Sequence, residues 1–291
     1  MGSLRASSIL AAFFTFTVPL MPVQAAFVRL SPKAARRFPH WYHKNVCRIL
    51  GVRVRVEGAV AQGVPVLLVS NHTSWLDIPV LSAVAPVSFV AKKEVGSWPF
   101  VSALARLQRT VFVDRTRRQD AGSAANEIMD RLGKGDTIVL FAEGTSSDGN
   151  RVLPFKTSLF GAVKTGSEPA ESQAVVQTAA VVYTHLHGIP LGRADRPRIG
   201  WYGDMEMPPH AWNVLKSGPI EVTVKLGPPV ALSDFSGRKE LALASERNIR
   251  RAVLGLLRHR PDDPALLPVE PSDDSRRQQK PLKRPESQTW T

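Results

Sequence analysis

The residue pattern best suited to catalysis is a histidine followed five positions later by an aspartate, in the segment from Asn71 to Asp77. A carboxylate that holds one imidazole nitrogen as N–H leaves the other nitrogen free to accept a proton from a hydroxyl group. On an ideal helix His72 and Asp77 would be about 140° out of alignment, so they meet only where the chain turns. A second interpretation is open at this spacing, in which Ser74 and Asp77 form a helix capping box and His72 only lines the turn.

Polar loops after two other apolar runs are candidates to share a site with this motif. Each of the runs at 64–70, 110–113 and 137–142 has the composition of a buried strand and leads directly into polar residues. Ligands of α/β proteins bind beyond the carboxyl ends of such strands, so the three loops are expected to converge on one cleft. Loop amides and the guanidinium group of Arg115 would there receive an anionic or zwitterionic group.

The stretch from about residue 52 to 257 alternates short β-rich runs with helical ones. Residues 119–132 and 238–257 carry apolar side chains at helical spacing, whereas 52–56 alternates apolar and basic residues with the period of a strand. This alternation predicts an α/β domain in which helices flank a mostly parallel sheet. The remaining strands are expected at 64–70, 88–91, 110–113, 137–142, 174–183 and 220–226.

Charge and hydropathy set the N-terminal end apart from this domain. The chain has 291 residues and a formal net charge of +13, and residues 1–60 hold nine basic residues against one acidic residue. The same end contains the uncharged run Ala6–Val28, which as a helix would be about 35 Å long, enough to cross a bilayer core. Pro19 and Pro22 are expected to break this helix, which favours a re-entrant hairpin within one leaflet over a single span.

The basic residues that follow the apolar run predict where the rest of the chain lies. They oppose a cleaved signal peptide, although residues 23–25 resemble a cleavage site. Together with nearby aromatic residues they suit the headgroups of a membrane with anionic lipids, and they place the remainder on the cytoplasmic side of the inner membrane. We predict a membrane anchor and basic interfacial segment at 1–48, a folded domain at 49–260 and a disordered, proline-rich tail at 261–291.

Few other residues point to chemistry. The single cysteine, Cys47, excludes an intramolecular disulfide, and His185 with His187 lack the clustered cysteine or carboxylate ligands of a metal site. The segment around Ser146 lacks the second glycine of a nucleophile elbow, and no dinucleotide or Walker motif is present. We therefore expect no metal and no resident cofactor.

The ordered blocks of the sequence resemble the glycerolipid acyltransferase superfamily, which includes lysophosphatidate synthases. The resemblance covers residues 50–230 and rests on three motifs in family order: the His-x4-Asp motif, the block with Phe112 and Arg115, and the Glu143-Gly144-Thr145 block. It implies an α/β acyltransferase domain at 49–260 in which His72 is the general base and Asp77 orients it. It also implies that the acceptor substrate is bound by Asn71, Arg115, Glu143, Gly144, Thr145 and Ser146.

Departures from the family pattern bear on the identity of the acceptor. Family members that act on glycerol phosphates usually carry Phe-Pro-Glu-Gly-Thr-Arg-Ser, whereas this chain has Ala142 for the proline and Ser146 for the arginine. The strings at 89–95, 107–115, 141–150 and 201–206 are similar to a narrower bacterial group that acylates lyso-ornithine lipid. An acceptor with an ammonium group and no phosphate needs less arginine, and Asp204 or Glu206 would suit the ammonium. A solvated loop is the simpler interpretation of these two carboxylates.

The resemblance implies a membrane-bound O-acyltransferase that moves a fatty acyl chain from a thioester of acyl carrier protein or coenzyme A to the hydroxyl of lyso-ornithine lipid. Acylation of 1-acylglycerol-3-phosphate, alone or as a second activity, remains open. A third hypothesis is a non-catalytic module that binds membrane or nucleic acid through its charge. The basic charge is concentrated beside the apolar run and is not interleaved with aromatic residues along a sheet, so no nucleic-acid partner is expected.

Overall fold

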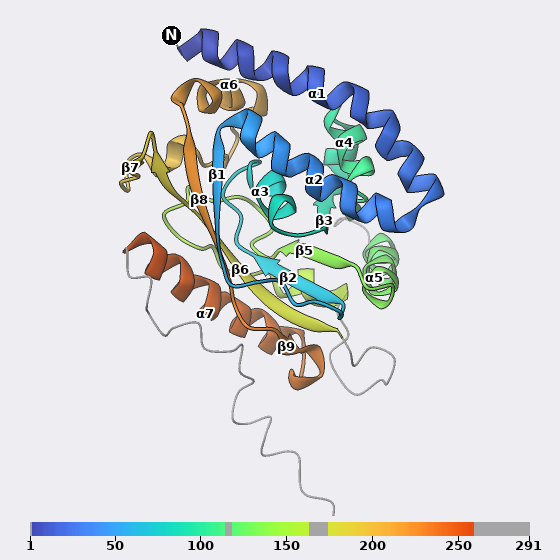
Figure 1. The fold of residues 1–291 in the computed structure, drawn as a ribbon. Coiled ribbons are helices and arrows are strands. Elements are labelled where there is room, and N and C mark those ends of the chain that lie inside the picture. The colour runs from blue at the N-terminus through green and yellow to red at the C-terminus, as the bar shows by residue number, and fades with distance from the viewer. Residues whose placement is uncertain (1, 114–117, 163–173, 259–291) are drawn as a thin grey trace, which may run out of the picture.

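The computed structural model describes residues 2–113, 118–162 and 174–258, and its strands form one nine-stranded sheet (Figure 1). The strands are β1 (Val52–Glu57), β2 (Val66–Ser70), β3 (Val87–Lys92), β4 (Val111–Val113), β5 (Thr137–Phe141), β6 (Val175–Leu186), β7 (Ile189–Pro190), β8 (Ile220–Leu226) and β9 (Val230–Ala231). Their order is β1-β8-β6-β2-β5-β3-β4, with β7 and β9 paired to β6. The strands from β6 to β4 in this order run parallel, while β8 pairs antiparallel with β6 and parallel with β1. The predicted α/β fold with a mostly parallel sheet is confirmed.

Helices cover both faces of this sheet. The α-helices of the described residues are α1 (Gly2–Leu30), α2 (Pro32–Leu50), α3 (Asp77–Val84), α4 (Val101–Leu107), α5 (Arg118–Gly133), α6 (Met207–Ser217) and α7 (Arg238–Leu257). Short 3-10 helices lie at η1 (Lys93–Ser97), η2 (Thr157–Ala162), η3 (Arg196–Arg198) and η4 (Leu232–Asp234). The predicted helices at 119–132 and 238–257 correspond to α5 and α7. The tail at 261–291 lies outside the described residues.

Alternate residues of the central strands build two apolar layers. Val66 and Leu68 of β2 pack into the layer that includes residues of α1, α2, α3 and α6, whereas Leu67 and Val69 pack against α7. In Figure 1, α1 and α2 accordingly lie on the opposite side of the sheet from α7. Because both faces are covered, the central strands are almost uninterrupted apolar runs, which is why the sequence revealed them. Their polar continuations are left at the carboxyl edge of the sheet.

The two N-terminal helices differ from the prediction made for them. Pro19 and Pro22 lie inside α1, which continues unbroken from Gly2 to Leu30, so the predicted break is wrong. Both prolines are exposed, and the carbonyl groups of Thr15 and Val18 that lose their helical donors belong to exposed residues as well. The bend in the chain comes instead at Ser31, which caps α2 ahead of Pro32, and α1 and α2 then lie side by side (Figure 1).

Polar contacts near both ends of α1 hold this helix against the rest of the molecule. Gln24 is buried and its amide donates to the carbonyl oxygens of Ala35 in α2 and Leu107 in α4, at 3.0 and 2.8 Å. At the other end of α1, Arg5 donates to the carbonyl oxygen of Leu215 in α6. Among the described helices, α1 alone is long and apolar enough to cross a membrane. These contacts hold α1 along the protein, and its outward side keeps apolar residues exposed, among them Leu4, Phe14 and Val18.

Candidate active site

The predicted pair of His72 and Asp77 is brought together by the turn that connects β2 to α3. The Nδ1 atom of His72 lies 2.8 Å from Oδ2 of Asp77, which also accepts from the backbone N–H groups of Thr73 and Ser74 at 2.7 and 3.0 Å. Asp77 is fully buried at the start of α3, and the imidazole side chain keeps 18% of its surface exposed. The carboxylate thus folds the turn and holds the imidazole with the same oxygen.

This geometry fixes both the tautomer and the orientation of His72. An ionised carboxylate only accepts, so Nδ1 carries the proton and the lone pair lies on Nε2. No group in the described part of the chain bonds to Nε2. The ring stacks on Phe141 at the end of β5, with 4.1 Å between ring centroids and 18° between the planes. An oriented, partly exposed Nε2 atom is able to accept a proton from a hydroxyl group.

The capping-box interpretation is half correct. The Ser74 N–H donates to Asp77 and the Asp77 N–H donates to the carbonyl oxygen of Ser74, as at a helix start. The hydroxyl of Ser74 is buried and bonds to none of the described residues, so the reciprocal bond of the box is missing. The Asp77 carboxylate therefore does both: it caps the turn at the start of α3 and orients the imidazole of His72.

Tyr183 completes the surroundings of Asp77. The sequence analysis predicted it only as part of a strand. Its hydroxyl donates to Oδ1 of Asp77 at 2.6 Å, and the side chain is buried. Burial and the neighbouring carboxylate raise the pKa of Tyr183 well above its usual value, so the phenol stays protonated. A buried tyrosine hydroxyl needs a partner, which was the available signal, but nothing local to residue 183 pointed to Asp77.

Asn71 connects the same turn to β6. β2 and β6 pair as parallel strands up to Ser70 and Ala179, and beyond that point the Asn71 amide replaces the next rung of the ladder. Its Oδ1 accepts from the Val181 N–H at 2.8 Å and its Nδ2 donates to the Val181 carbonyl at 2.9 Å. The predicted acceptor-binding residue Asn71 thus has its amide committed to holding the turn in register with β6.

Glu143 performs a similar task from the end of β5. Its two carboxylate oxygens accept from the backbone N–H groups of His72 and Leu153, each at 2.8 Å, and it is almost completely buried. Burial raises the pKa of Glu143 to about 7, against the opposing effect of these two hydrogen bonds. Gly144 follows with a φ of 70°, a conformation that favours glycine. This part of the predicted acceptor loop is a buried support for the catalytic turn.

The other predicted binding residues fall into three situations. Thr145 is exposed beside the turn, and the Ser146 hydroxyl donates to the carbonyl oxygen of Trp201. The Trp201 N–H in turn donates to the carbonyl of Thr73 at 2.9 Å, so the segment before α6 lies directly against the catalytic turn. Arg115 lies outside the described residues.

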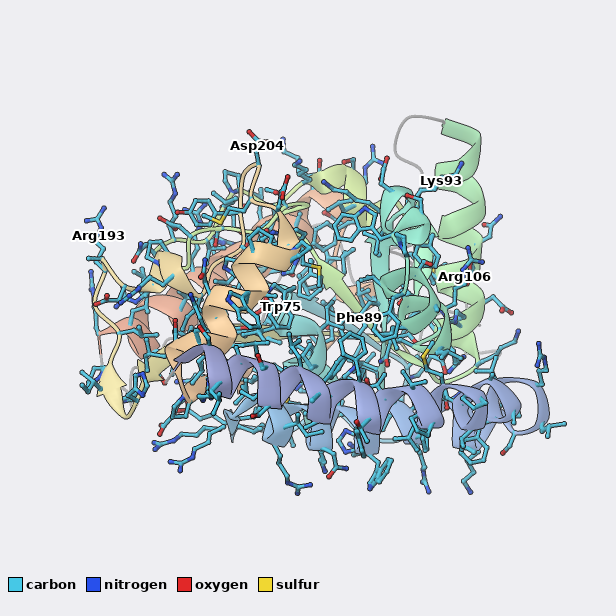
Figure 2. All side chains as sticks on the ribbon, turned by 90° about the horizontal axis from the view of Figure 1, so that it is seen from above. Trp75, Phe89, Lys93, Arg106, Arg193 and Asp204 are labelled. Carbon is cyan, nitrogen blue, oxygen red and sulfur yellow. The ribbon has the colours of Figure 1, made fainter. Side chains whose placement is uncertain are left out.

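Aromatic side chains connect the neighbourhood of this turn with α4, α6 and α1. Trp98, which precedes α4, meets Trp201 edge to face with 6.0 Å between ring centroids, and Phe100 packs against Phe14 of α1. Trp75 in the turn donates to His210 of α6 at 3.2 Å. Figure 2 shows Trp75 inside the molecule, between α6 and α4. The catalytic turn is therefore in contact with elements that themselves contact α1.

The two carboxylates considered for an ammonium group lie apart from this centre. Asp204 and Glu206 are exposed in the loop before α6, and Figure 2 places Asp204 at the edge of the molecule. Among the described residues, neither side chain bonds to the turn at His72, in keeping with a solvated loop. In the described residues, no group of three or more His, Cys, Asp or Glu side chains is arranged to hold a metal ion.

Comparisons with known proteins identify the family of this fold and site. A family model described as Acyltransferase matches residues 51–182, the span that carries the turn, Glu143 and most of β6. A lyso-ornithine lipid O-acyltransferase of Brucella abortus is 46% identical over 257 residues, covering 88% of this chain and 96% of that protein. The chain belongs to the acyltransferase family. It is an enzyme that transfers acyl groups, as the resemblance implied.

Further relatives of this acyltransferase fall into two named groups. A lyso-ornithine lipid O-acyltransferase of Rhizobium meliloti is 45% identical over 242 residues, covering 83% of each protein. A 1-acyl-sn-glycerol-3-phosphate acyltransferase of Neisseria gonorrhoeae is 31% identical and covers 65% of this chain and 69% of that protein. The crystal structure of the 1-acyl-sn-glycerophosphate acyltransferase of Thermotoga maritima matches with a TM-score of 0.62 and 27% identity, over 88% of this chain and 94% of that one. The apolar helix α1 indicates that the enzyme associates with membranes.

Proposed function

We propose that this acyltransferase transfers a fatty acyl chain from an acyl thioester to the hydroxyl group of lyso-ornithine lipid. The observation that carries the catalytic part is the free Nε2 atom of His72, oriented by the bond from Nδ1 to Asp77. The acceptor is supported by relatives of that name at 45–46% identity over most of the chain. It is also supported by Ser146, a neutral residue where phosphate-using family members carry an arginine.

The reaction then needs no group beyond the two substrates and the pair of His72 and Asp77. Nε2 of His72 takes the proton of the acceptor hydroxyl as its oxygen bonds to the thioester carbonyl carbon. The tetrahedral intermediate collapses, the carbon–sulfur bond breaks, and the imidazolium returns the proton to the departing thiolate. Asp77 stays ionised throughout and stabilises the imidazolium. The products are the acylated lipid and a free thiol.

The remaining predicted residues take two roles in this proposal. Asn71, Glu143 and Gly144 hold the catalytic turn, through their contacts with β6 and the loop after β5. Thr145 and Ser146 border the acceptor headgroup, and the family resemblance alone assigns Arg115 to the acceptor. The donor is a thioester of acyl carrier protein or of coenzyme A, either of which is acidic and suits a basic protein.

We infer a location at the inner membrane with the catalytic domain on the cytoplasmic side. Helices α1 and α2 expose large apolar side chains, which include Phe14, Val18, Leu30 and Trp41. Helix α2 also exposes the basic residues Lys33, Arg37 and Lys44. Apolar side chains would enter the acyl region while the cations meet anionic headgroups. Contacts from α1 through Phe100 and Trp98 to Trp201 lead from this surface to the site, which suits a lipid acceptor that arrives from the bilayer.

Acylation of 1-acylglycerol-3-phosphate is the second candidate, as the sole or an additional activity. It is favoured by the relatives of that name from Neisseria and Thermotoga. Purified full-length enzyme in mixed micelles, supplied with each acceptor and with acyl-carrier-protein or coenzyme A thioesters, distinguishes the candidates by the acylated product formed. Lyso-ornithine lipid should give the higher kcat/KM. His72→Ala should abolish product with both acceptors, whereas His185→Ala, whose imidazole faces Thr184 and Glu221 and not Asp77, should not.

Two results would contradict the proposal. Wild-type turnover by His72→Ala removes the catalytic role of the imidazole. A higher kcat/KM for 1-acylglycerol-3-phosphate, with no product from lyso-ornithine lipid, establishes the second candidate in place of the first.

A further inference from the structure

Tyr183 is the last residue of β6 before an irregularity in that strand. The pairing of β6 with β8 shifts register between Tyr183 and His185, so the strand carries an extra residue just beyond the tyrosine. Such bulges bend a strand and redirect side chains, often beside active sites. The same strand is held to the catalytic turn by the two bonds between Asn71 and Val181. Tyr183 is two residues past Val181 and therefore points to the same face of the sheet.

The result is a buried chain of three polar groups. The Tyr183 hydroxyl donates to Oδ1 of Asp77 at 2.6 Å, and Oδ2 of Asp77 faces Nδ1 of His72 at 2.8 Å. Asp77 has no exposed surface, and Tyr183 is the only described residue that donates to Oδ1. Without this donor, a charged oxygen would be buried and unpaired, which is costly.

We propose that Tyr183 is a positioning residue for catalysis, which holds the Asp77 carboxylate in the rotation that presents Oδ2 to His72. This inference rests on the proposed function, because it assumes that His72 is the base. Tyr183 touches neither substrate in this scheme. It acts through Asp77 by fixing its rotation and by sharing its negative charge.

The surroundings keep Tyr183 a constant donor. Its pKa is raised by burial and by Asp77, so it does not ionise in the range where the enzyme is assayed. Besides His72 and Asp77 themselves, the titratable groups near Tyr183 and this pair are Glu143 and, from α2, Cys47. Burial raises the pKa of the Cys47 thiol to about 12, so it too is neutral. Glu143 does titrate near pH 7, so a change in the pH profile that persists in a Glu143→Gln background is attributable to the pair of His72 and Asp77.

Tyr183→Phe removes the hydroxyl and keeps the ring in the apolar core. We expect kcat to fall about tenfold with KM nearly unchanged, as one hydrogen bond to a charged group is lost. The acid limb of the kcat/KM profile should move to higher pH by about half a unit to one unit, because Asp77 then shares its charge only with the imidazolium and the backbone. Tyr42→Phe is the matched control, since the Tyr42 hydroxyl bonds to Thr17 at 2.9 Å, away from the site. It should leave both kcat and the pH profile unchanged.

A double-mutant cycle separates positioning from a purely structural effect. If Tyr183 acts through Asp77, Tyr183→Phe should change kcat little in an Asp77→Asn background, where there is no carboxylate to position. Additive losses, or a Tyr183→Phe enzyme with the wild-type pH profile and kcat, would overturn the inference. His72→Ala is assayed alongside: if it is active, the proposed function fails, and if it is inactive while Tyr183→Phe behaves as wild type, only the role of Tyr183 fails.

Discussion

Two buried aspartates at opposite ends of the parallel strands are stabilised in contrasting ways. Asp77 follows the carboxyl end of β2 and accepts from an imidazole, a phenol and two backbone amides. Asp136 precedes the amino end of β5 and pairs with the guanidinium groups of Arg36, Arg109 and Arg131, at 2.7, 2.6 and 3.4 Å. The first set contains no permanently charged donor, whereas the second carries three positive charges.

The difference separates a carboxylate suited to chemistry from one that fastens the fold. Neutral donors leave Asp77 with negative charge that can stabilise an imidazolium cation beside it. The three arginines more than neutralise Asp136, and they come from α2, the turn before β4, and α5. Burial and repulsion from Arg109 lower the pKa of Arg131, which shows how crowded with positive charge this cluster is. Asp136 therefore joins three elements, and among them is the helix that runs beside α1.

The largest effect on activity is expected from Asp77→Asn. The amide keeps the shape of the carboxylate: its oxygen can accept from the turn, and the Tyr183 hydroxyl can rotate to accept from the new NH2 group. The charge is lost, so kcat should fall by about 10² to 10⁴, while the free energy of unfolding changes by less than about 1 kcal/mol. Steady-state kinetics and urea denaturation measure the two quantities. Unchanged kcat with a lower free energy of unfolding would reduce Asp77 to a helix cap.

Asp136→Asn should produce the opposite result. Removing one partner of a buried ion pair leaves uncompensated charge, which costs about 3 to 5 kcal/mol. About 3 kcal/mol is expected here, since Arg36 keeps 34% of its side chain exposed. The kcat of the folded enzyme should be unchanged. Asp130→Asn is the control: its pair with Lys134, the residue just after α5, lies in solvent, so the loss should stay below about 0.5 kcal/mol. If Asp136→Asn and Asp130→Asn lowered the free energy of unfolding equally, Asp136 would not fasten the fold, and its contrast with Asp77 would disappear.

The same contrast explains what the sequence revealed. Asp77 lies only five residues from His72, so spacing and a strand-to-turn context offered their contact as one of two interpretations, and the family resemblance decided for it. The partners of Asp136 come from three separate elements, and no local pattern connects them. Tyr183 was placed correctly in a strand, but its contact with Asp77 depends on the register between β2 and β6, which Asn71 sets. Spacing predicts contacts within a turn, whereas contacts between strands require the sheet.

Two other differences have equally specific causes. The prediction that Pro19 and Pro22 break the helix counted the hydrogen bonds that they remove. It did not consider that both prolines lie on the exposed face of α1, where water can satisfy the freed carbonyl groups. Asn71 and Glu143 were assigned to the acceptor through family resemblance, yet their side chains bond to backbone groups of the turn and its neighbours. A motif identifies which residues matter at a site and does not separate substrate contacts from supporting contacts.

Glu143 extends the comparison to a third buried carboxylate, which has only two backbone donors. Its pKa is raised from 4.5 to about 7, so the folded protein favours the protonated form. Its stabilising contribution is therefore complete below about pH 4.5 and is lost as the pH rises through 7. The free energy of unfolding of wild type minus that of Glu143→Gln should fall by up to about 3 kcal/mol between pH 4.5 and 7 and be level above pH 8. Urea denaturation at several pH values measures this, and a constant difference would mean that the backbone donors offset the burial of Glu143.

The smallest expected effect concerns Ser146, whose hydroxyl donates to the Trp201 carbonyl. An arginine at this position supplies a charge-assisted bond of about 1.5 to 3 kcal/mol to a phosphate group. Ser146→Arg should therefore raise the ratio of kcat/KM for 1-acylglycerol-3-phosphate over lyso-ornithine lipid by about tenfold to a hundredfold.

Substitution by arginine also removes the bond to Trp201, and Ser146→Ala separates the two effects. Alanine loses the same bond without adding a charge, so it should lower kcat/KM for both acceptors by a similar factor and leave their ratio unchanged. If Ser146→Ala shifts the ratio as far as Ser146→Arg does, the position of the Trp201 segment sets the preference. If neither variant moves it, residue 146 supports the turn without recognising the headgroup, and it then belongs with Asn71 and Glu143.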